Sequence, residues 1–224
     1  MRGARRDVVK RFRLADDIDK VYDNIGTDKF MHAAISSYRG LRLTLNDPWE
    51  TTLCFIISQY NNVKRIRGIV KGIVSRFGSP ISGPDGKVVG MRFPTSAELR
   101  GATLKELESC GAGFRARYIK DAAEFCTYNM DLYKTSTAYP KLRAQLMEMN
   151  GVGEKVADCI ALMGYGKLEA FPVDVWVKRT MEKVYFKGKA MGNAEIREFA
   201  SDLWGGYAGY AQQYLFWHGR QNGV

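Results

Sequence analysis

The segment Met149–Asp158 reads MNGVGEKVAD and decides how the chain is expected to fold. Residues 139–148 before its turn have the apolar spacing of a helix, and a second helical pattern covers residues 154–164. Gly151 and Gly153 permit backbone angles that other residues avoid, so the turn between the helices can be tight. Backbone amides at the start of the second helix then point outward, where they can bind an anion. We therefore predict two helices joined by a hairpin that is suited to holding a phosphate.

An ordinary hairpin between two helices would carry the same glycines, and the residues that follow favour a functional one. Lys155 lies in the first turn of the second helix, where a cation is disfavoured by the helix dipole. A neutral amine is the form that a covalent lysine nucleophile uses. Nineteen residues later, Asp174 precedes a helical pattern at 174–185 and could cap it. A cap and a catalytic carboxylate are compatible roles.

Most of the remaining chain also reads as helical. Asp47 and Pro48 suit the cap and the first position of a buried helix. Residues 78–94 hold glycine, proline and an Asp85-Gly86 turn, and they predict a loop or a small β-hairpin. Further helical patterns cover residues 62–77, 95–100, 103–109, 116–130, 193–204 and 207–219. The sequence therefore predicts an all-α fold.

Composition excludes several classes of protein. In 224 residues, 34 basic and 24 acidic side chains give a net charge of +10, which weakly favours a polyanionic partner. Four cysteines without a CxxC pair and only two histidines argue against a zinc ribbon, a cysteine-held cluster and a Ser-His-Asp triad. We expect no membrane span, no secretory signal and free thiols in a reducing interior. Residues 1–13 carry six basic side chains and predict either a phosphate-tracking arm or a solvated terminus.

Several segments in order resemble one family. NGVGEKVADC followed by PVD is similar to the helix-hairpin-helix DNA glycosylases, and most of all to the 8-oxoguanine DNA glycosylases. The other matching segments, spread over about residues 20–220, are DPWE at 47–50, SQYNNVKRI at 58–66, GFRARY at 113–118 and LWGGYAGYAQ at 203–212. The resemblance implies two helical subdomains with the hairpin at their cleft. We expect a helical domain over 14–224, with a central lobe at about 47–138 and a hairpin lobe at about 139–224, joined by N-terminal helices.

The resemblance implies a bifunctional DNA glycosylase and AP lyase that removes 8-oxoguanine, opposite cytosine, from double-stranded DNA. Lys155 would attack C1′ of the damaged nucleoside, and Asp174 would position it and stabilise positive charge on the sugar. The resulting Schiff base would permit strand scission by β-elimination. No cofactor is expected, although hairpin carbonyls of this superfamily often hold a monovalent cation. A monomer in the cytoplasm of a prokaryote is the expected form.

The target base must leave the stack to be reached. By resemblance, the residues that line its pocket are Cys159, Met163, Gln212, Phe216 and Trp176. Lys155, Cys159 and Met163 recur at every fourth position and share one face of the helix. The two sulfur-containing side chains also suit simple core packing. Trp176 stands where the family pattern has a histidine, so its role stays open between lining the pocket and filling space.

A second group of residues would act on the opposite strand. Phe114 matches the wedge that fills the hole left by the extruded base. Arg65 and Arg115 match the residues that read the unpaired cytosine, with phosphate contact as the alternative. Tyr60 stands where the family has an asparagine, and Asn61 is the candidate to replace it. Gly151, Val152 and Gly153 would bind the DNA phosphate.

Larger family members carry an N-terminal β domain, and only about 20 residues precede the matched region, so we expect the short form. Its discrimination against guanine is then expected to come from elsewhere or to be weaker.

Three alternatives to this function stay open at this point. A related glycosylase for another damaged base is the nearest alternative function. A non-catalytic helix-hairpin-helix module would need Gly151 and Gly153 but would leave Lys155, Asp174 and Gln212 unexplained. A basic scaffold protein would bind DNA with a steep salt dependence and form no covalent intermediate.

Overall fold

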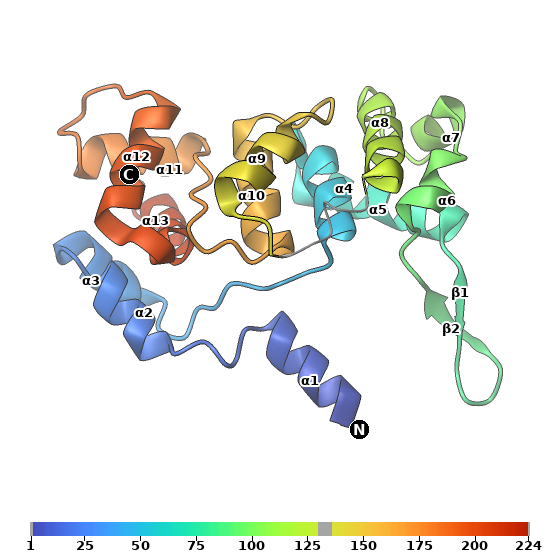
Figure 1. Ribbon diagram of the computed structural model, residues 1–224, viewed down its shortest axis with the longest axis horizontal. Coiled ribbons are helices and arrows are strands. Elements are labelled where there is room, and N and C mark those ends of the chain that lie inside the picture. The colour runs from blue at the N-terminus through green and yellow to red at the C-terminus, as the bar shows by residue number, and fades with distance from the viewer. Residues whose placement is uncertain (1, 130–135, 224) are drawn as a thin grey trace. The chain divides into compact units, whose positions relative to one another are not determined.

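The computed structural model describes residues 2–129 and 136–223, which form helices and one small antiparallel hairpin of strands (Figure 1). The prediction of an all-α fold is therefore confirmed. Contacts divide the chain into two units, one of residues 1–46 with 161–224 and one of residues 47–160. The division differs from the predicted lobes, because the hairpin at 149–153 belongs with the central helices. The boundary falls inside a single helix, between Ile160 and Ala161.

The first unit is built from both ends of the chain. Its helices are α1 (Arg2–Arg11), α2 (Ile18–Ile25), α3 (Lys29–Ser37), α11 (Val175–Val184), α12 (Asn193–Trp204) and α13 (Ala208–Gln221), with a 3-10 turn at Gly205–Tyr207. α13 packs against α2, α3, α11 and α12. Tyr214 of α13 is fully buried, meets the ring of Tyr22 edge to face and donates to the carbonyl of Leu41 at 3.1 Å. These contacts explain why the N-terminal helices belong with the C-terminal ones.

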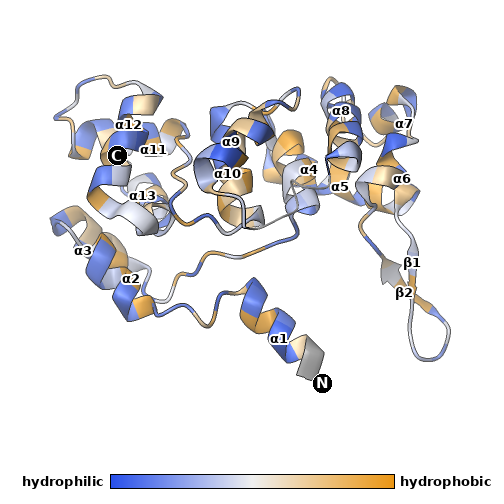
Figure 2. Ribbon diagram, in the orientation of Figure 1, coloured by the Kyte–Doolittle hydropathy of each residue, from blue (hydrophilic) through white to orange (hydrophobic). Residues whose placement is uncertain are grey.

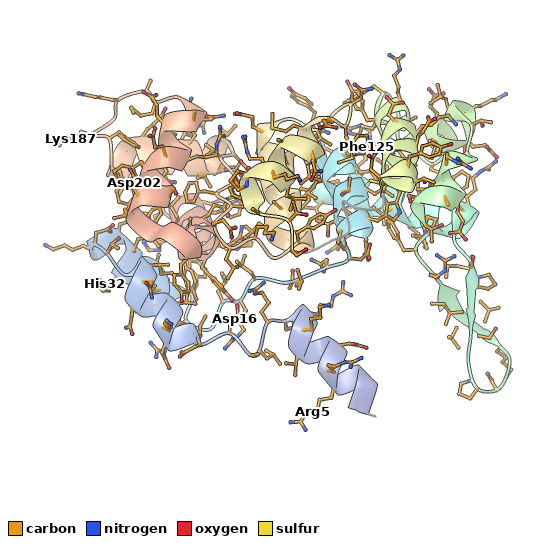
Figure 3. All side chains as sticks on the ribbon, in the orientation of Figure 1. Arg5, Asp16, His32, Phe125, Lys187 and Asp202 are labelled. Carbon is orange, nitrogen blue, oxygen red and sulfur yellow. The ribbon has the colours of Figure 1, made fainter. Side chains whose placement is uncertain are left out.

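The basic N-terminal segment is helical over Arg2–Arg11 and not frayed, and its described side chains are mostly exposed, as expected of a solvated terminus. Figure 3 labels Arg5 on this helix and Asp16 in the turn that follows it. Asp16 accepts hydrogen bonds from Arg13 at 2.7 Å and from the Tyr210 hydroxyl at 2.8 Å, which fastens the turn to α13. Burial, together with Asp16, raises the pKa of Tyr210 to about 12.

The second unit contains α4 (Pro48–Ser58), α5 (Val63–Phe77), β1 (Pro80–Ser82), β2 (Val88–Met91), α6 (Ser96–Arg100), α7 (Leu104–Ser109), α8 (Arg115–Tyr128), α9 (Tyr139–Met147) and the first part of α10 (Glu154–Gly164). α8 packs against α4, α6 and α7. Asp47 caps α4 by accepting from the Glu50 amide at 2.9 Å, and Pro48 stands in the first turn, as predicted. The helix predicted at 116–130 ends at Tyr128, and residue 130 lies outside the described residues.

The predicted β-hairpin is also confirmed, because β1 pairs antiparallel with β2. Both colours of the hydropathy scale run along most helices in Figure 2, as expected for helices with one apolar face. The core of the second unit includes Leu53, Ile56, Ile57, Ile73, Leu99, Leu107 and Ile119, all completely inaccessible. Among residues 2–129 and 136–223, no helix has both the length and the apolar content needed to cross a bilayer.

Candidate active site

The hairpin between α9 and α10 has the geometry that its glycines predict. Gly151 adopts φ +83°, which favours glycine, and a Cβ added there would stand 2.5 Å from the ring of Tyr118. The Gly151 carbonyl accepts a hydrogen bond from Gln59 Nε2 at 2.9 Å. Gly153 is exposed, and a Cβ there would meet nothing within 4 Å. The turn is thus packed against the protein at Gly151 and open at Gly153, where a phosphate has room to approach.

A buried network joins the two helices of the hairpin. Asp158 is fully buried, and its Oδ1 accepts from the Tyr139 hydroxyl and from Arg143 Nε, each at 2.7 Å. The guanidinium of Arg143 also pairs with Glu154 at 3.1 Å. Burial opposes the charge of Arg143, but Asp158 and Glu154 outweigh it and raise the pKa. The network fixes the first turns of α10, and therefore the backbone that carries Lys155.

Sequence reasoning missed this network, although one signal for it was present. Asp158 interrupts the otherwise apolar run Val156–Leu162. A carboxylate inside an apolar face is rarely tolerated without a partner. The identity of its partners, Tyr139 and Arg143 on the preceding helix, could not be read from that position alone.

Lys155 stands in the first turn of α10 and is half-buried. Its Nζ lies 5.5 Å from the centroid of the Phe55 ring, which α4 supplies from the same unit. An ammonium over an aromatic face is attracted to it, so Phe55 restricts where the amine can lie. Phe55 lies in the apolar run at 53–57, and nothing in the sequence singles it out as a neighbour of Lys155.

Replacing Phe55 by leucine is expected to slow the step carried out by Lys155 by about threefold to tenfold, because the amine loses a ring face that orients it. The measurement is the single-turnover rate of borohydride-trappable adduct formation on lesion DNA at saturating protein. Phe125, a half-buried ring on α8, provides the matched control as Phe125→Leu. Equal rates for unchanged protein and Phe55→Leu would contradict an orienting role.

Asp174 caps α11, as one of its two proposed roles required. Its Oδ1 accepts a hydrogen bond from the Val177 amide at 2.8 Å. The carboxylate is half-buried and has a fixed position at the positive end of the helix. Two residues later, Trp176 is half-buried. The guanidinium carbon of Arg179 lies over its ring, 5.7 Å from the ring centroid.

Gln212 ties α13 to the segment that precedes Asp174. It is buried, its Nε2 donates to the Pro172 carbonyl at 3.1 Å, and its Oε1 accepts from Gln213 at 2.7 Å. A glutamine in an apolar helix face needs a polar partner, and Gln212 has two. Phe216, one turn further along α13, is half-buried and pairs edge to face with Trp217.

The predicted pocket residues are divided between the two units. Lys155 and Cys159 lie in the second unit, and Cys159 is buried. The members in the first unit are Met163, Asp174, Trp176, Gln212 and Phe216. Helix α10 is continuous from Glu154 to Gly164, so Lys155, Cys159 and Met163 share one of its faces, as predicted. The roles assigned to these side chains toward a base stay predictions.

The residues predicted to face the opposite strand gather in the second unit. Phe114 is 58% exposed and Tyr60 is 94% exposed, which for large rings is uncommon without a partner. Tyr60 also has φ +48°, a conformation that residues with side chains rarely adopt. Asn61 donates to the Ile57 carbonyl at 3.0 Å, and Arg65 is exposed.

Arg115 is held differently from its neighbours. It is 1% exposed and stacks over Phe114, with its guanidinium carbon 4.3 Å from the ring centroid. Its Nε donates to the Gln59 carbonyl at 2.8 Å and its Nη2 to the Tyr60 carbonyl at 2.9 Å. Burial, and then the nearby charge of Arg65, lowers the pKa of this guanidinium. Arg115 thus braces the turn after α4, and contact with a cytosine would require it to exchange these bonds.

Replacing Arg115 by alanine is expected to reduce the free energy of unfolding by about 2–3 kcal/mol, since two backbone carbonyls lose a charged donor. The same change should lower any preference for cytosine opposite the lesion. Chemical denaturation and excision rates with each opposite base measure the two effects. Arg117→Ala, at an exposed position on the same helix, is the control. Normal stability in Arg115→Ala would contradict the bracing role.

Comparisons with known proteins identify the family of this chain. Residues 53–205 match the family model described as HhH-GPD superfamily base excision DNA repair protein. A protein of Methanothermobacter thermautotrophicus named probable N-glycosylase/DNA lyase is 34% identical over 95% of this chain and 74% of its own length. The Saccharomyces cerevisiae N-glycosylase/DNA lyase is 36% identical over 93% of this chain, which spans 65% of that protein.

One solved structure extends the likeness to three dimensions. It is the Clostridium acetobutylicum 8-oxoguanine glycosylase/lyase in complex with double-stranded DNA containing cytosine opposite 8-oxoguanine. The TM-score is 0.86 at 33% identity, and the match covers 96% of this chain and 74% of that one. A 3-methyladenine DNA glycosylase from Archaeoglobus fulgidus, with a TM-score of 0.80 at 24% identity, shares the fold.

Proposed function

Because this chain belongs to the HhH-GPD superfamily of base excision DNA repair proteins, we propose that it is a bifunctional DNA glycosylase and AP lyase. Its substrate is 8-oxoguanine in double-stranded DNA, with cytosine as the opposite base. Relatives named N-glycosylase/DNA lyase, and the solved 8-oxoguanine glycosylase/lyase with its DNA, support this substrate and activity.

The observation that carries the proposal is the position of Lys155. The amine stands in the first turn of α10, directly after a glycine turn that is open at Gly153. A hairpin that serves only to bind phosphate can do so with its backbone amides, so it does not require a lysine at this position. An amine needed as a nucleophile gains from restraint by Phe55, because orientation lowers the barrier of the covalent step.

The chemistry follows from the amine. The unprotonated Nζ attacks C1′ of the 8-oxoguanosine, the bond from C1′ to N9 breaks, and the base leaves with the bonding electrons and takes up a proton. Opening of the sugar ring gives a Schiff base between Lys155 and C1′. Loss of a proton from C2′ then expels the 3′ phosphate by β-elimination, and water releases the lysine.

Asp174 stabilises positive charge on the sugar while the base departs. Its hydrogen bond from the Val177 amide of α11 keeps the carboxylate from turning away. The side chains proposed to contact the extruded base are Cys159 of the second unit and Met163, Gln212, Phe216 and Trp176 of the first. Phe114, Tyr60, Asn61, Arg65 and Arg115 act on the opposite strand, and Gly151, Val152 and Gly153 hold a phosphate.

These steps require no organic cofactor, because the amine supplies the covalent chemistry. A monovalent cation held by hairpin carbonyls would contribute charge next to a phosphate. The Gly151 carbonyl already accepts from Gln59, the Met149 carbonyl from Val152 and the Gly153 carbonyl from Ala157. Each carbonyl oxygen has a second lone pair, so the hairpin can still offer oxygen ligands. The protein acts on DNA as a monomer.

Borohydride trapping tests the proposal. The protein is incubated with an end-labelled duplex containing one 8-oxoguanine opposite cytosine, reduced with borohydride and run on a denaturing gel. A covalent adduct with lesion DNA, and none with an undamaged duplex, is the expected result. A strand break that appears only after alkali treatment, without an adduct, would show that the enzyme excises the base but has no lyase activity. With neither adduct nor excision, the same assay on other damaged bases distinguishes a related glycosylase from a binding module.

A further inference from the structure

Gln59 occupies an unusual position between two parts of the second unit. It follows α4 directly and precedes Tyr60 and Asn61 in the turn that leads to α5. Its backbone carbonyl accepts from Arg115, and its side-chain Nε2 donates to the Gly151 carbonyl at 2.9 Å. One residue therefore joins the turn braced by Arg115 to the hairpin that precedes Lys155. The connection spans 92 positions of the sequence.

A second contact runs beside the first. The ring of Tyr118 lies directly under Gly151, where a Cβ would approach it within 2.5 Å. The same ring meets Phe114 edge to face, with centroids 6.2 Å apart. The start of α8 thus contacts both the exposed ring of Phe114 and the hairpin. Because the Tyr118 ring packs against both, a shift of one is expected to displace the other.

The turn between the two contacts contains a residue in an unfavourable backbone conformation. Tyr60 has φ +48° and is almost fully exposed, so its own side chain does little to hold it there. The hydrogen bond from Arg115 Nη2 to the Tyr60 carbonyl holds this backbone in place. If the guanidinium turned toward a base, the carbonyls of Gln59 and Tyr60 would both lose this donor, and the turn would be free to move.

We propose that Gln59 is a positioning residue that couples the turn facing the opposite base to the hairpin carrying Lys155. This inference rests on the proposed function, and it adds that the base opposite the lesion changes the rate of the Lys155 step through the bond from Gln59 to Gly151. In this proposal Gln59 acts through the hairpin and not directly on the DNA or the reacting atoms. It determines where the hairpin lies when Arg115 changes partner.

The test compares two substitutions of Gln59 with one control. Gln59→Leu removes the donor with little change of size, and Gln59→Glu keeps the size but places a carboxylate oxygen against the Gly151 carbonyl. The control is Asn150→Ala, because the Asn150 side chain ties the hairpin to α8, by a 3.1 Å bond to Asp121, whereas Gln59 ties it to the turn after α4. Single-turnover excision rates are measured for 8-oxoguanine opposite cytosine and opposite adenine, with a melting temperature for each variant.

In the unchanged protein we expect faster excision opposite cytosine. In Gln59→Leu and Gln59→Glu the ratio of the two rates should fall by about threefold to tenfold, the effect of one hydrogen bond, mainly because the reaction opposite cytosine slows. Asn150→Ala should change both rates by the same factor and leave the ratio unaltered. If Gln59→Leu does not fold, Gln59→Glu alone decides the outcome.

An unchanged ratio in the Gln59 variants, or the same shift in Asn150→Ala, would overturn the coupling and leave Gln59 a structural residue. Equal excision opposite cytosine and adenine by the unchanged protein would overturn it as well. Both results would leave the proposed function intact, because excision still occurs. Absence of any lesion-dependent excision by the unchanged protein would overturn the proposed function, and this inference with it.

Discussion

Lys155→Gln is expected to abolish excision and the borohydride adduct while retaining binding to lesion DNA. Glutamine has a similar length but no nucleophilic amine, so the covalent route closes. The single-turnover rate should fall by about 1,000-fold or more, as for other enzymes that lose their nucleophile. A gel-shift titration with 8-oxoguanine duplex measures the binding that remains.

The matched control is Lys141→Gln, at an exposed lysine of α9, which removes the same charge from the same hairpin. It should form the adduct as the unchanged protein does. If Lys155→Gln loses DNA binding together with activity, its lysine is a phosphate contact, and the nucleophile must be sought elsewhere. If it excises the base and only the adduct is lost, the enzyme uses water as the nucleophile.

The second large effect is expected at Asp174. Asp174→Asn removes the charge but keeps a side chain that caps helices about as well as aspartate. Excision should therefore slow by about 100-fold or more through lost electrostatic stabilisation, while stability changes by no more than about 0.5 kcal/mol. Excision kinetics and chemical denaturation of the same preparation give the two numbers.

Asp174→Ala completes the comparison, because it removes the cap as well as the charge. Its free energy of unfolding should be lower than that of Asp174→Asn by about 1 kcal/mol, and its excision should be no faster. An Asp174→Asn variant with normal excision would show that the carboxylate serves α11 alone. The cap bond to Val177 makes this a real alternative, since it accounts for an aspartate at this position without any chemistry.

Local signals allowed much of the fold to be predicted. The glycine turn at Gly151, the proline at Pro48 and the Asp85-Gly86 turn each act through their own backbone, so the elements beside them follow from a few neighbouring residues. The bounds of α2 and α3 were not predicted. Both are short and depend on packing against α13, which lies far away in the sequence.

The candidate site could be predicted as residue types but not as contacts. The family motifs identified Lys155, Asp174 and Gln212. Asp174 caps its helix, and the Gln212 side-chain amide donates to the Pro172 carbonyl. The burial of Arg115 was not foreseeable, since an exposed and a buried arginine look alike in a sequence. The bond between Gln59 and Gly151 joins residues 92 positions apart, and no local rule reports it. The division of the chain within α10, rather than near residue 139, likewise reflects contacts that only the folded chain makes.

The packing of Gly151 has a consequence for protein engineering. A segment of ten residues that carries a glycine turn and a lysine looks portable, as if it could be grafted onto another pair of helices. In this protein the turn leans on the ring of Tyr118, its carbonyl is held by Gln59, and its second helix is anchored by Arg143 on the first. A working transplant therefore has to carry an aromatic ring that packs under the turn, an amide donor for its carbonyl and an arginine that pairs with the second helix. These come from three separate helices or their ends. The sequence motif identifies the hairpin, but the contacts from other helices are also needed to hold it in place.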